Sequence, residues 1–406
     1  MPRFLRMSPS LVVLLALAVV SFTGRCWAGT ESTILTFPNN GGTFPGGAGP
    51  YAGLISDAAG NLFGTTLYGG RDYVGVVFEL VPQASGTYKE VVLYSFLQNH
   101  DCYGPMGRLL QDSAGNLYGA AQAGCAHSNG GVFELSPTGG GKYAYAVIYA
   151  FPAVTNAGQP NSPLSMDSAG NLYGVFGSGG TQGYGQIYQL KPSGTGGWVP
   201  KIIYTFGHTG DGTYATGPLT LDSTGNIYGT TAYGGLGNGT VYEVSPAAGG
   251  WKEKLLYNFR GTTDGFFPLN GVTLAPTGDL FGTTDGSNGT VFRLSLSGST
   301  WLKHVIHPFG AAGDGVNPAE YGSLTMDSSG NIYGSTFIGG TDNFGVVYEL
   351  SPSGGTWSET ILYSFEGSDD GSQPNADLLL DSSGNILGTT FTAGHTGGGT
   401  VFKITP

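Results

Sequence analysis

Residues 222–229 read Asp-Ser-Thr-Gly-Asn-Ile-Tyr-Gly, and this pattern occurs seven times along the 406-residue chain, once in degenerate form. The degenerate copy, at 275–282, has Asp279 where the others have Asn. Successive copies begin 55, 55, 55, 53, 52 and 54 residues apart, at positions 57, 112, 167, 222, 275, 327 and 381. A fixed period of this size predicts a stacked or circular array of one supersecondary unit.

Each period holds four predicted strands, here named a to d in chain order. In the copy at 212–259 they are residues 217–222, 226–232, 239–245 and 251–259, with alternating apolar and polar residues between turn-forming segments. The a–b link suits a tight turn whose Gly is left-handed and whose Asp caps turn amides. With 74 Gly, 23 Tyr, 22 Phe and 10% charged residues, the composition excludes collagen and disorder. Four antiparallel strands in about 50 residues predict the blade of a β-propeller.

The two ends of the chain complement each other. The seventh copy stops after strand c, at Val401-Phe-Lys-Ile404, and residues 31–37 (Glu-Ser-Thr-Ile-Leu-Thr-Phe) resemble the strand d sequence at 359–365. Because closure removes exposed sheet edges, we expect one all-β domain over 29–406. It is a seven-bladed propeller of four-stranded antiparallel blades, and its closing blade combines the N-terminal strand with three C-terminal strands.

Residues 1–28 are predicted to be a secretory signal peptide. Arg3 and Arg6 precede an apolar segment at 11–20, and Cys26-Trp-Ala28 is an acceptable cleavage site before Gly29. Ten apolar residues are too few to span a bilayer, and no second apolar segment of spanning length follows. We therefore expect a secreted or periplasmic protein that is soluble after cleavage and has no membrane span.

The charge of the chain excludes several partners. The full chain has a formal net charge of −12. Removal of the signal also removes Arg3, Arg6 and Arg25, which leaves 12 basic and 27 acidic residues. Such a surface repels phosphate backbones and anionic membranes, so we expect no nucleic acid partner. The sequence leaves a protein or a glycan as the ligand, and we expect a monomer.

The repeats resemble the GloVer tandem repeat of exported bacterial proteins, which often carry a C-terminal sorting anchor. The matching residues are the Asp-x-x-Gly-Asn-Ile-Tyr-Gly-Thr-Thr core at 222–231, the Gly-Gly that follows it, and the Val-Phe-Glu-Leu-x-Pro strand at 132–137. The resemblance covers nearly everything after residue 30 and implies an extracytoplasmic location without an established activity. The chain departs from the family in lacking a sorting tail after residue 406, so surface attachment and free secretion both stay open.

Candidate binding residues lie in the loops between blades. Since the a–b turns occupy one face of a propeller, the d–a and b–c loops share the other, called here the d–a/b–c face. Its d–a loops carry acidic residues that form either a ring for weak Ca²⁺ binding or ordinary turns: Asp101, Asp211, Asp264, Asp314 and Asp370. Four histidines are also predicted on this face: His100, His127, His208 and His395.

Cys102 and Cys125 are the only cysteines left after signal removal. They are equidistant from the turn at 112–115, so they should face each other across strands a and b and form a disulfide, which export favours. A metal site with the nearby His100 and His127 is the alternative, but the spacing matches no standard zinc motif. We expect no metal site and no cofactor apart from weak Ca²⁺.

The sequence leaves two classes of function. No nucleophile motif, phosphate-binding loop or unique carboxylate pair is visible, so no catalytic residues are predicted. The leading hypothesis is a non-catalytic extracytoplasmic binding or scaffold propeller with its ligand on the d–a/b–c face. The alternative is a secreted carbohydrate-active enzyme or lyase, because a fold does not determine a function.

Overall fold

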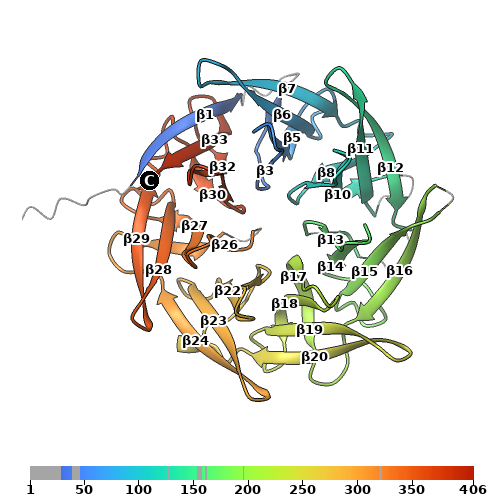
Figure 1. The fold of residues 1–406 in the computed structure, drawn as a ribbon, viewed down its shortest axis with the longest axis vertical. Coiled ribbons are helices and arrows are strands. Elements are labelled where there is room, and N and C mark those ends of the chain that lie inside the picture. The colour runs from blue at the N-terminus through green and yellow to red at the C-terminus, as the bar shows by residue number, and fades with distance from the viewer. Residues whose placement is uncertain are drawn as a thin grey trace, which may run out of the picture.

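The computed structural model describes residues 29–38, 46–125, 129–152, 158–160, 162–194, 196–319 and 322–406. Seven antiparallel sheets surround a central axis, and each sheet forms one blade (Figure 1). The predicted seven-bladed β-propeller is therefore confirmed. The signal peptide predicted at 1–28 lies outside the described residues. Among the described residues, no helix is long and apolar enough to cross a membrane.

The blades follow one another in chain order. Blade 1 contains β3 (Ile55–Ser56), β4 (Leu62–Thr66), β6 (Val76–Pro82) and β7 (Tyr88–Ser95), beside the small β2 (Gly47–Ala48) and β5 (Tyr68–Gly69) pair. Blade 2 contains β8 (Cys102–Pro105), β9 (Leu110–Gln111), β10 (Leu117–Gly124), β11 (Gly131–Gly139) and β12 (Lys142–Ala150). Blade 3 contains β13 (Ser165–Met166), β14 (Leu172–Phe176), β15 (Gln186–Pro192) and β16 (Trp198–Thr205). Blade 4 contains β17 (Gly212–Leu221), β18 (Ile227–Gly234), β19 (Thr240–Ala247) and β20 (Gly250–Asn258).

The remaining three blades keep the same order. A 3₁₀ turn, η1 (Thr262–Asp264), leads into blade 5, with β21 (Thr273–Leu274), β22 (Leu280–Thr284), β23 (Thr290–Ser297) and β24 (Thr300–Pro308). Blade 6 contains β25 (Gly315–Pro318), β26 (Thr325–Met326), β27 (Ile332–Gly339), β28 (Val346–Ser353) and β29 (Thr356–Ser364). Blade 7 contains β30 (Ser372–Pro374), β31 (Leu379–Leu380), β32 (Ile386–Thr392), β33 (Gly397–Thr405) and β1 (Thr30–Pro38).

Closure joins the two ends of the chain as predicted. Strand β1 pairs antiparallel with β33, with Glu31 opposite Ile404 and Thr33 opposite Phe402. The ring of Phe37, at the end of β1, is fully buried and meets Phe78 of blade 1 edge to face at 5.3 Å. The N-terminal strand therefore completes the last blade and also packs against the first one, at the perimeter of the ring (Figure 1).

The repeated motif forms the a–b hairpin turn. In the first copy, Asp57 Oδ1 accepts hydrogen bonds from the amides of Ala59 and Asn61, both at 2.9 Å, and Gly60 has φ 82°. The degenerate copy keeps the turn, because the amide of Ala275 still donates to the carbonyl of Asp279. The side chain of Asp279 is instead held by Arg293, at 2.7 Å. The predicted turn chemistry is thus confirmed.

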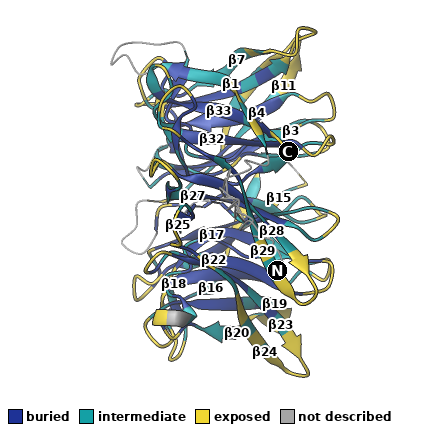
Figure 2. Ribbon diagram, turned by 90° about the vertical axis from the view of Figure 1, so that its left-hand side faces the viewer, coloured by how far each residue is buried: buried dark blue, intermediate teal, exposed yellow. Residues whose placement is uncertain are grey.

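The last glycine of each motif makes room for an aromatic ring of strand c. At Gly282, a Cβ atom would lie 2.6 Å from Cζ of Phe292, which is fully buried. A ring occupies this place in every blade: Phe78, Phe133, Tyr188, Tyr242, Phe292, Tyr348 and Phe402. Buried residues run through the blades, while exposed residues gather at the loops (Figure 2).

The core lies between blades rather than in one centre. Trp198 of blade 3 meets Tyr118 of blade 2 at 5.9 Å, and Trp357 of blade 6 meets Phe281 of blade 5 at 5.7 Å. These contacts show that aromatic residues at the start of strand d cover the gaps between blades. Hydroxyl groups of strand a add hydrogen bonds to carbonyls of the next blade, as from Thr273 to Leu324 at 2.6 Å. Each blade is therefore stabilised by its neighbours.

Candidate functional site

Residues with left-handed backbone conformations distinguish the two faces of the ring. In the described a–b and c–d turns, every residue with positive φ is a glycine. The d–a and b–c segments contain ten other residues with φ between 52° and 66°: Tyr73, Cys125, Tyr214, Thr262, Phe267, Ser287, Asn317, Asn343, Gln373 and Ala393. Such conformations cost on the order of 1 kcal/mol or more in a side-chain-bearing residue and cluster at functional sites. On the d–a/b–c face, therefore, residues with side chains adopt a backbone conformation that is energetically unfavourable for them.

Exposed aromatic side chains lie on the same face. Between blades 3 and 5, Tyr214 meets Tyr233 at 6.1 Å, and Tyr233 meets Phe267 at 5.1 Å between ring centroids. The amide of Tyr214 donates to the carbonyl of Tyr184 at 2.8 Å, which joins Tyr184 of blade 3 to this group through the backbone. Tyr184, Tyr214 and Tyr233 are each more than 40% exposed. We call these four residues the aromatic platform.

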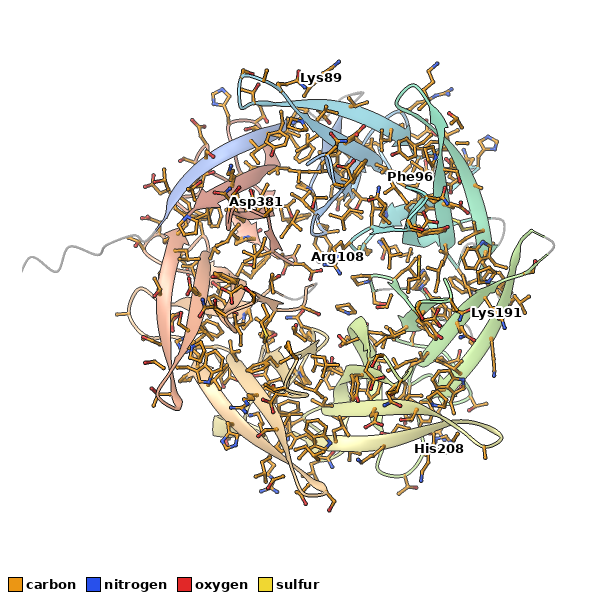
Figure 3. The ribbon with its side chains drawn as sticks, viewed as in Figure 1. Lys89, Phe96, Arg108, Lys191, His208 and Asp381 are labelled. Atoms are coloured by element: carbon orange, nitrogen blue, oxygen red, sulfur yellow. A yellow bond between two sulfur atoms is a disulfide. The ribbon has the colours of Figure 1, made fainter. Side chains whose placement is uncertain are left out.

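A groove with polar side chains in its walls adjoins the platform. Its polar walls include Gln182, Gln186, Thr205 and His208. Gln186 Nε2 donates to Thr205 Oγ1 at 3.0 Å, which holds both side chains in place. His208 lies at the perimeter of the ring, far from the axis (Figure 3). The groove and platform offer hydrogen-bonding groups beside flat apolar rings, a combination typical of ligand sites.

The five predicted aspartates occupy equivalent positions in the d–a loops, and each accepts hydrogen bonds from its own loop. Tyr94 of strand d donates to Asp101 at 2.7 Å, and the amide of Leu97 donates to the same carboxylate at 2.8 Å. Corresponding tyrosine hydroxyls reach Asp211, Asp264 and Asp370. The five carboxylates are thus integral to their turns, and weak Ca²⁺ binding stays a prediction.

The predicted histidines do not form one group. His208 Nδ1 lies 3.3 Å from Asp211 Oδ2, and His395 Nδ1 lies 3.3 Å from Asp369 Oδ1, where both side chains are exposed. His100 is exposed at the end of the d–a loop before blade 2, and His127 falls outside the described residues. Of the three described histidines, only His208 lines the groove.

The predicted disulfide between Cys102 and Cys125 is present, with a Cα–Cα distance of 4.3 Å. The predicted direct pairing is wrong by one residue, because Cys102 lies opposite Gly124. Strand a carries a bulge: Pro105 and Leu110 are five positions apart, but their partners on β10, Ala121 and Tyr118, are three positions apart. A left-handed conformation at Cys125, φ 57°, then brings its sulfur back to Cys102.

The centre of the ring carries an ion pair between an exposed arginine and a buried aspartate. Arg108 of blade 2 lies near the middle of the ring (Figure 3), and its Nη1 is 3.1 Å from Oδ2 of Asp377 in blade 7. The amide of Ser323 in blade 6 donates to the same carboxylate at 2.6 Å. Burial raises the pKa of Asp377, and Arg108 opposes this shift. These contacts fasten the inner ends of three blades.

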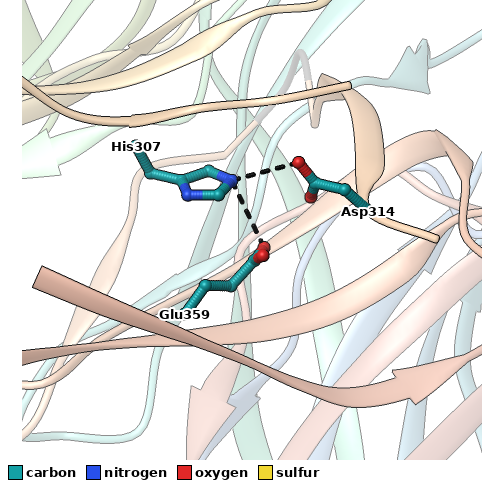
Figure 4. A group of neighbouring side chains, drawn as sticks. All are labelled: His307, Asp314 and Glu359. Carbon is teal, nitrogen blue, oxygen red and sulfur yellow. Dashed lines mark hydrogen bonds and ion pairs between the residues drawn. The ribbon is translucent and has the colours of Figure 1, made fainter. Parts of the chain in front are cut away.

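One group of side chains was missed in the sequence. His307, Asp314 and Glu359 lie within 4.8 Å of one another through their ligand atoms (Figure 4). Burial raises the pKa of Glu359 to about 7, and the hydrogen bond from His307 helps to hold that of Asp314 below its ordinary range despite burial. The signal was visible as Val305-Ile-His-Pro-Phe309, where the other full copies of strand d have Tyr in place of His307.

Two further glutamates at blade junctions give the fold a pH dependence. Burial raises the pKa of Glu31 and of Glu253 to about 7, from 4.5. The folded state therefore favours their protonated forms, so this stabilisation is complete below about pH 4.5 and is lost as the pH rises through 7.

We expect the melting temperature to fall between pH 5 and pH 8. Glu253→Gln should reduce that fall, whereas Asp342→Asn, at an exposed carboxylate, should not; a fall unchanged in Glu253→Gln would contradict this assignment.

The fold and the repeat together define a β-propeller built from one sequence unit. The Gloeobacter/Verrucomicrobia repeat matches residues 141–325 and 285–406, which together span 141–406. The chain belongs to this repeat family, which confirms the resemblance seen in the sequence. No match to a curated protein sequence was found.

Solved structures are similar in fold at low identity. A 6-phosphogluconolactonase candidate from Bacteroides fragilis is 13% identical with a TM-score of 0.52, and the match covers 77% of this chain and 85% of that chain. A gluconolactonase from Xanthomonas campestris is 12% identical with a TM-score of 0.43, covering 89% of this chain and 97% of that chain. At these identities the likeness extends to the propeller fold alone.

Proposed function

We propose that this protein is a non-catalytic, extracytoplasmic binding propeller that holds a glycan on its d–a/b–c face. The observation that carries the proposal is the placement, among the residues that the structure describes, of all ten left-handed residues other than glycine on that face. Unfavourable backbone conformations cluster at functional sites. Ten of them lie on this face, whereas the described turns of the other face have only glycines in such conformations, so we infer that this face is the functional one. The signal-like segment at 1–28 and the disulfide both favour an exported protein.

The chemistry of the platform and groove favours a glycan over a peptide. Sugar rings present flat apolar faces together with many hydroxyl groups, and the site offers exposed phenol rings beside amide and hydroxyl side chains. Gln182 and Gln186 carry both donors and acceptors, which suits hydroxyl groups. Protein hot spots are enriched in Arg as well as Tyr, and the described groove lining contains no Arg. An uncharged polysaccharide fits this lining best.

Binding to a panel of neutral and anionic polysaccharides tests the proposal, with sugar release assayed in parallel. Tyr214→Asn removes the ring but keeps a residue that tolerates the left-handed conformation, and Tyr233→Ala removes its neighbour. Each is expected to weaken binding by roughly tenfold, from the loss of about 1.4 kcal/mol of contact. Leu296→Ala, at an exposed apolar residue near the end of β23 and next to the c–d turn, is the matched control and should bind as the wild type does.

Two results would contradict the proposal. Equal affinity in the wild type, Tyr214→Asn and Tyr233→Ala would remove the platform from the site. Release of sugar products by the wild type would replace the binding function with the enzymatic alternative.

A further inference from the structure

The group formed by His307, Asp314 and Glu359 joins two blades. His307 comes from the end of β24 and Asp314 from the loop that follows, while Glu359 comes from β29 of blade 6 (Figure 4). His307 Nε2 lies 3.2 Å from Asp314 Oδ2 and 3.4 Å from Glu359 Oε1. The side chains of the three residues are 15%, 3% and 18% exposed. It is the only group of three or more such side chains within ligand distance among the residues that the structure describes.

Equivalent positions at the other blade junctions carry a different set of residues. Where blade 4 meets blade 5, Tyr257 donates to Asp264, and Lys303 occupies the place of Glu359 and pairs with that carboxylate. A hydroxyl donor and a cation thus balance the aspartate there.

A glutamate at the place of Glu359 also occurs at other junctions, since Glu253 lies near Asp211 and Glu31 lies near Asp370. What differs between blades 5 and 6 is the imidazole of His307, which replaces the phenol that donates to the aspartate at those two junctions. This single substitution places a nitrogen ligand beside a pair of carboxylates.

The hydrogens available within the group do not satisfy its acceptors. A neutral imidazole has one N–H, so Nε2 can donate to only one of two carboxylate oxygens at a time. Asp314 Oδ2 already accepts from the amide of Gly310 at 3.0 Å. Glu359 Oε1 is buried and has no hydrogen-bond donor among the described side chains and backbone. Two buried carboxylates beside one imidazole are stabilised by a positive charge placed between them, which a shared proton or a bound metal ion supplies.

The distances suit a metal ion. Zinc binds imidazole nitrogen at about 2.0–2.1 Å and carboxylate oxygen at about 2.0–2.2 Å, so neighbouring ligands of a tetrahedral site lie roughly 3.3 Å apart. The two nitrogen-to-oxygen distances, 3.2 and 3.4 Å, match this spacing. One imidazole with two carboxylates is a ligand set for a first-row transition ion rather than for Ca²⁺.

We propose that His307 Nε2, Asp314 Oδ2 and Glu359 Oε1 bind one divalent transition-metal ion, with Zn²⁺ as its representative, and that this ion fastens blade 5 to blade 6. Three protein ligands leave a fourth position for water. The imidazole binds the ion through its Nε2 lone pair, with its remaining proton on Nδ1. The site is separate from the glycan platform, so it stands or falls independently of the proposed function.

The test is titration of the chelator-treated full mature chain with ZnCl₂, followed by calorimetry and thermal melting. The wild type is expected to bind one equivalent and to melt at a higher temperature with Zn²⁺. His307→Tyr restores the residue present at five other junctions, so it should fold normally, lose that equivalent and show no thermal shift. Glu359→Gln keeps the shape of the side chain and is expected to weaken binding at least tenfold. Tyr363→His, beside Asp370 and Glu31, should raise the stoichiometry to two.

The proposal is overturned if the wild type binds no Zn²⁺. It is also overturned if His307→Tyr and Glu359→Gln bind it with wild-type stoichiometry and affinity, which would place the metal at exposed histidines instead.

Discussion

Deletion of residues 29–38 is expected to destabilise the whole ring by more than the roughly 3–5 kcal/mol that truncation of one buried Phe costs. The deletion removes Phe37, which is fully buried against blade 1, and exposes the edge of β33. An open ring loses contacts at both sides of the gap, because its core lies between blades. The urea midpoint of the deleted chain, compared with that of residues 29–406, measures the loss.

Two controls separate loss of the strand from general damage. Ser32→Ala, at an exposed position of β1, should leave the midpoint near its wild-type value. A synthetic peptide of residues 29–38, added to the deleted chain, should raise the midpoint by pairing with β33. A deleted chain that unfolds at the wild-type midpoint would show that β1 does not close the ring.

Substitution of a motif glycine is the second change with a large expected effect. Gly282→Ala places a methyl group 2.6 Å from Cζ of Phe292, so the ring must move within a packed core. Overpacking of this kind typically costs about 1–3 kcal/mol, and the upper end is expected because Phe292 has no exposed surface to move into. Thermal or urea unfolding measures the change.

A double substitution identifies the cause. Gly282→Ala combined with Phe292→Leu should be more stable than the sum of the single effects predicts, because the smaller side chain leaves room for the methyl group. Strict additivity of the two changes would mean that the glycine is needed for its backbone freedom instead of for the ring.

Much of the fold could be predicted because the deciding interactions are local. The Asp57 side chain caps its own turn within four residues, so the hairpin is visible in any copy of the motif. Closure was predictable because residues 31–37 carry the missing strand pattern. The disulfide register was not, because it depends on the bulge between Pro105 and Leu110, which the spacing of the cysteines about the turn does not reveal.

The candidate site was less predictable for a physical reason. A left-handed Gly is suggested by its residue type, but Tyr214 and Phe267 adopt that conformation only because the surrounding loops impose it. The aromatic platform also joins residues of three blades, which no local pattern connects. The case of His307 is different. The sequence shows that His307 replaces the Tyr of the other copies, but it does not show that the imidazole lies beside Glu359, which is 52 residues later and in the next blade.

Hydrogen–deuterium exchange with the tightest-binding polysaccharide of the panel tests the central claim, that the d–a/b–c face binds the ligand. Protection is expected in the loops that carry the platform and groove, at 177–185, 207–217, 233–239 and 261–268. The a–b and c–d turns should exchange at the same rate with and without the polysaccharide. Protection of the a–b and c–d turns with unchanged exchange in those four loops would contradict the account.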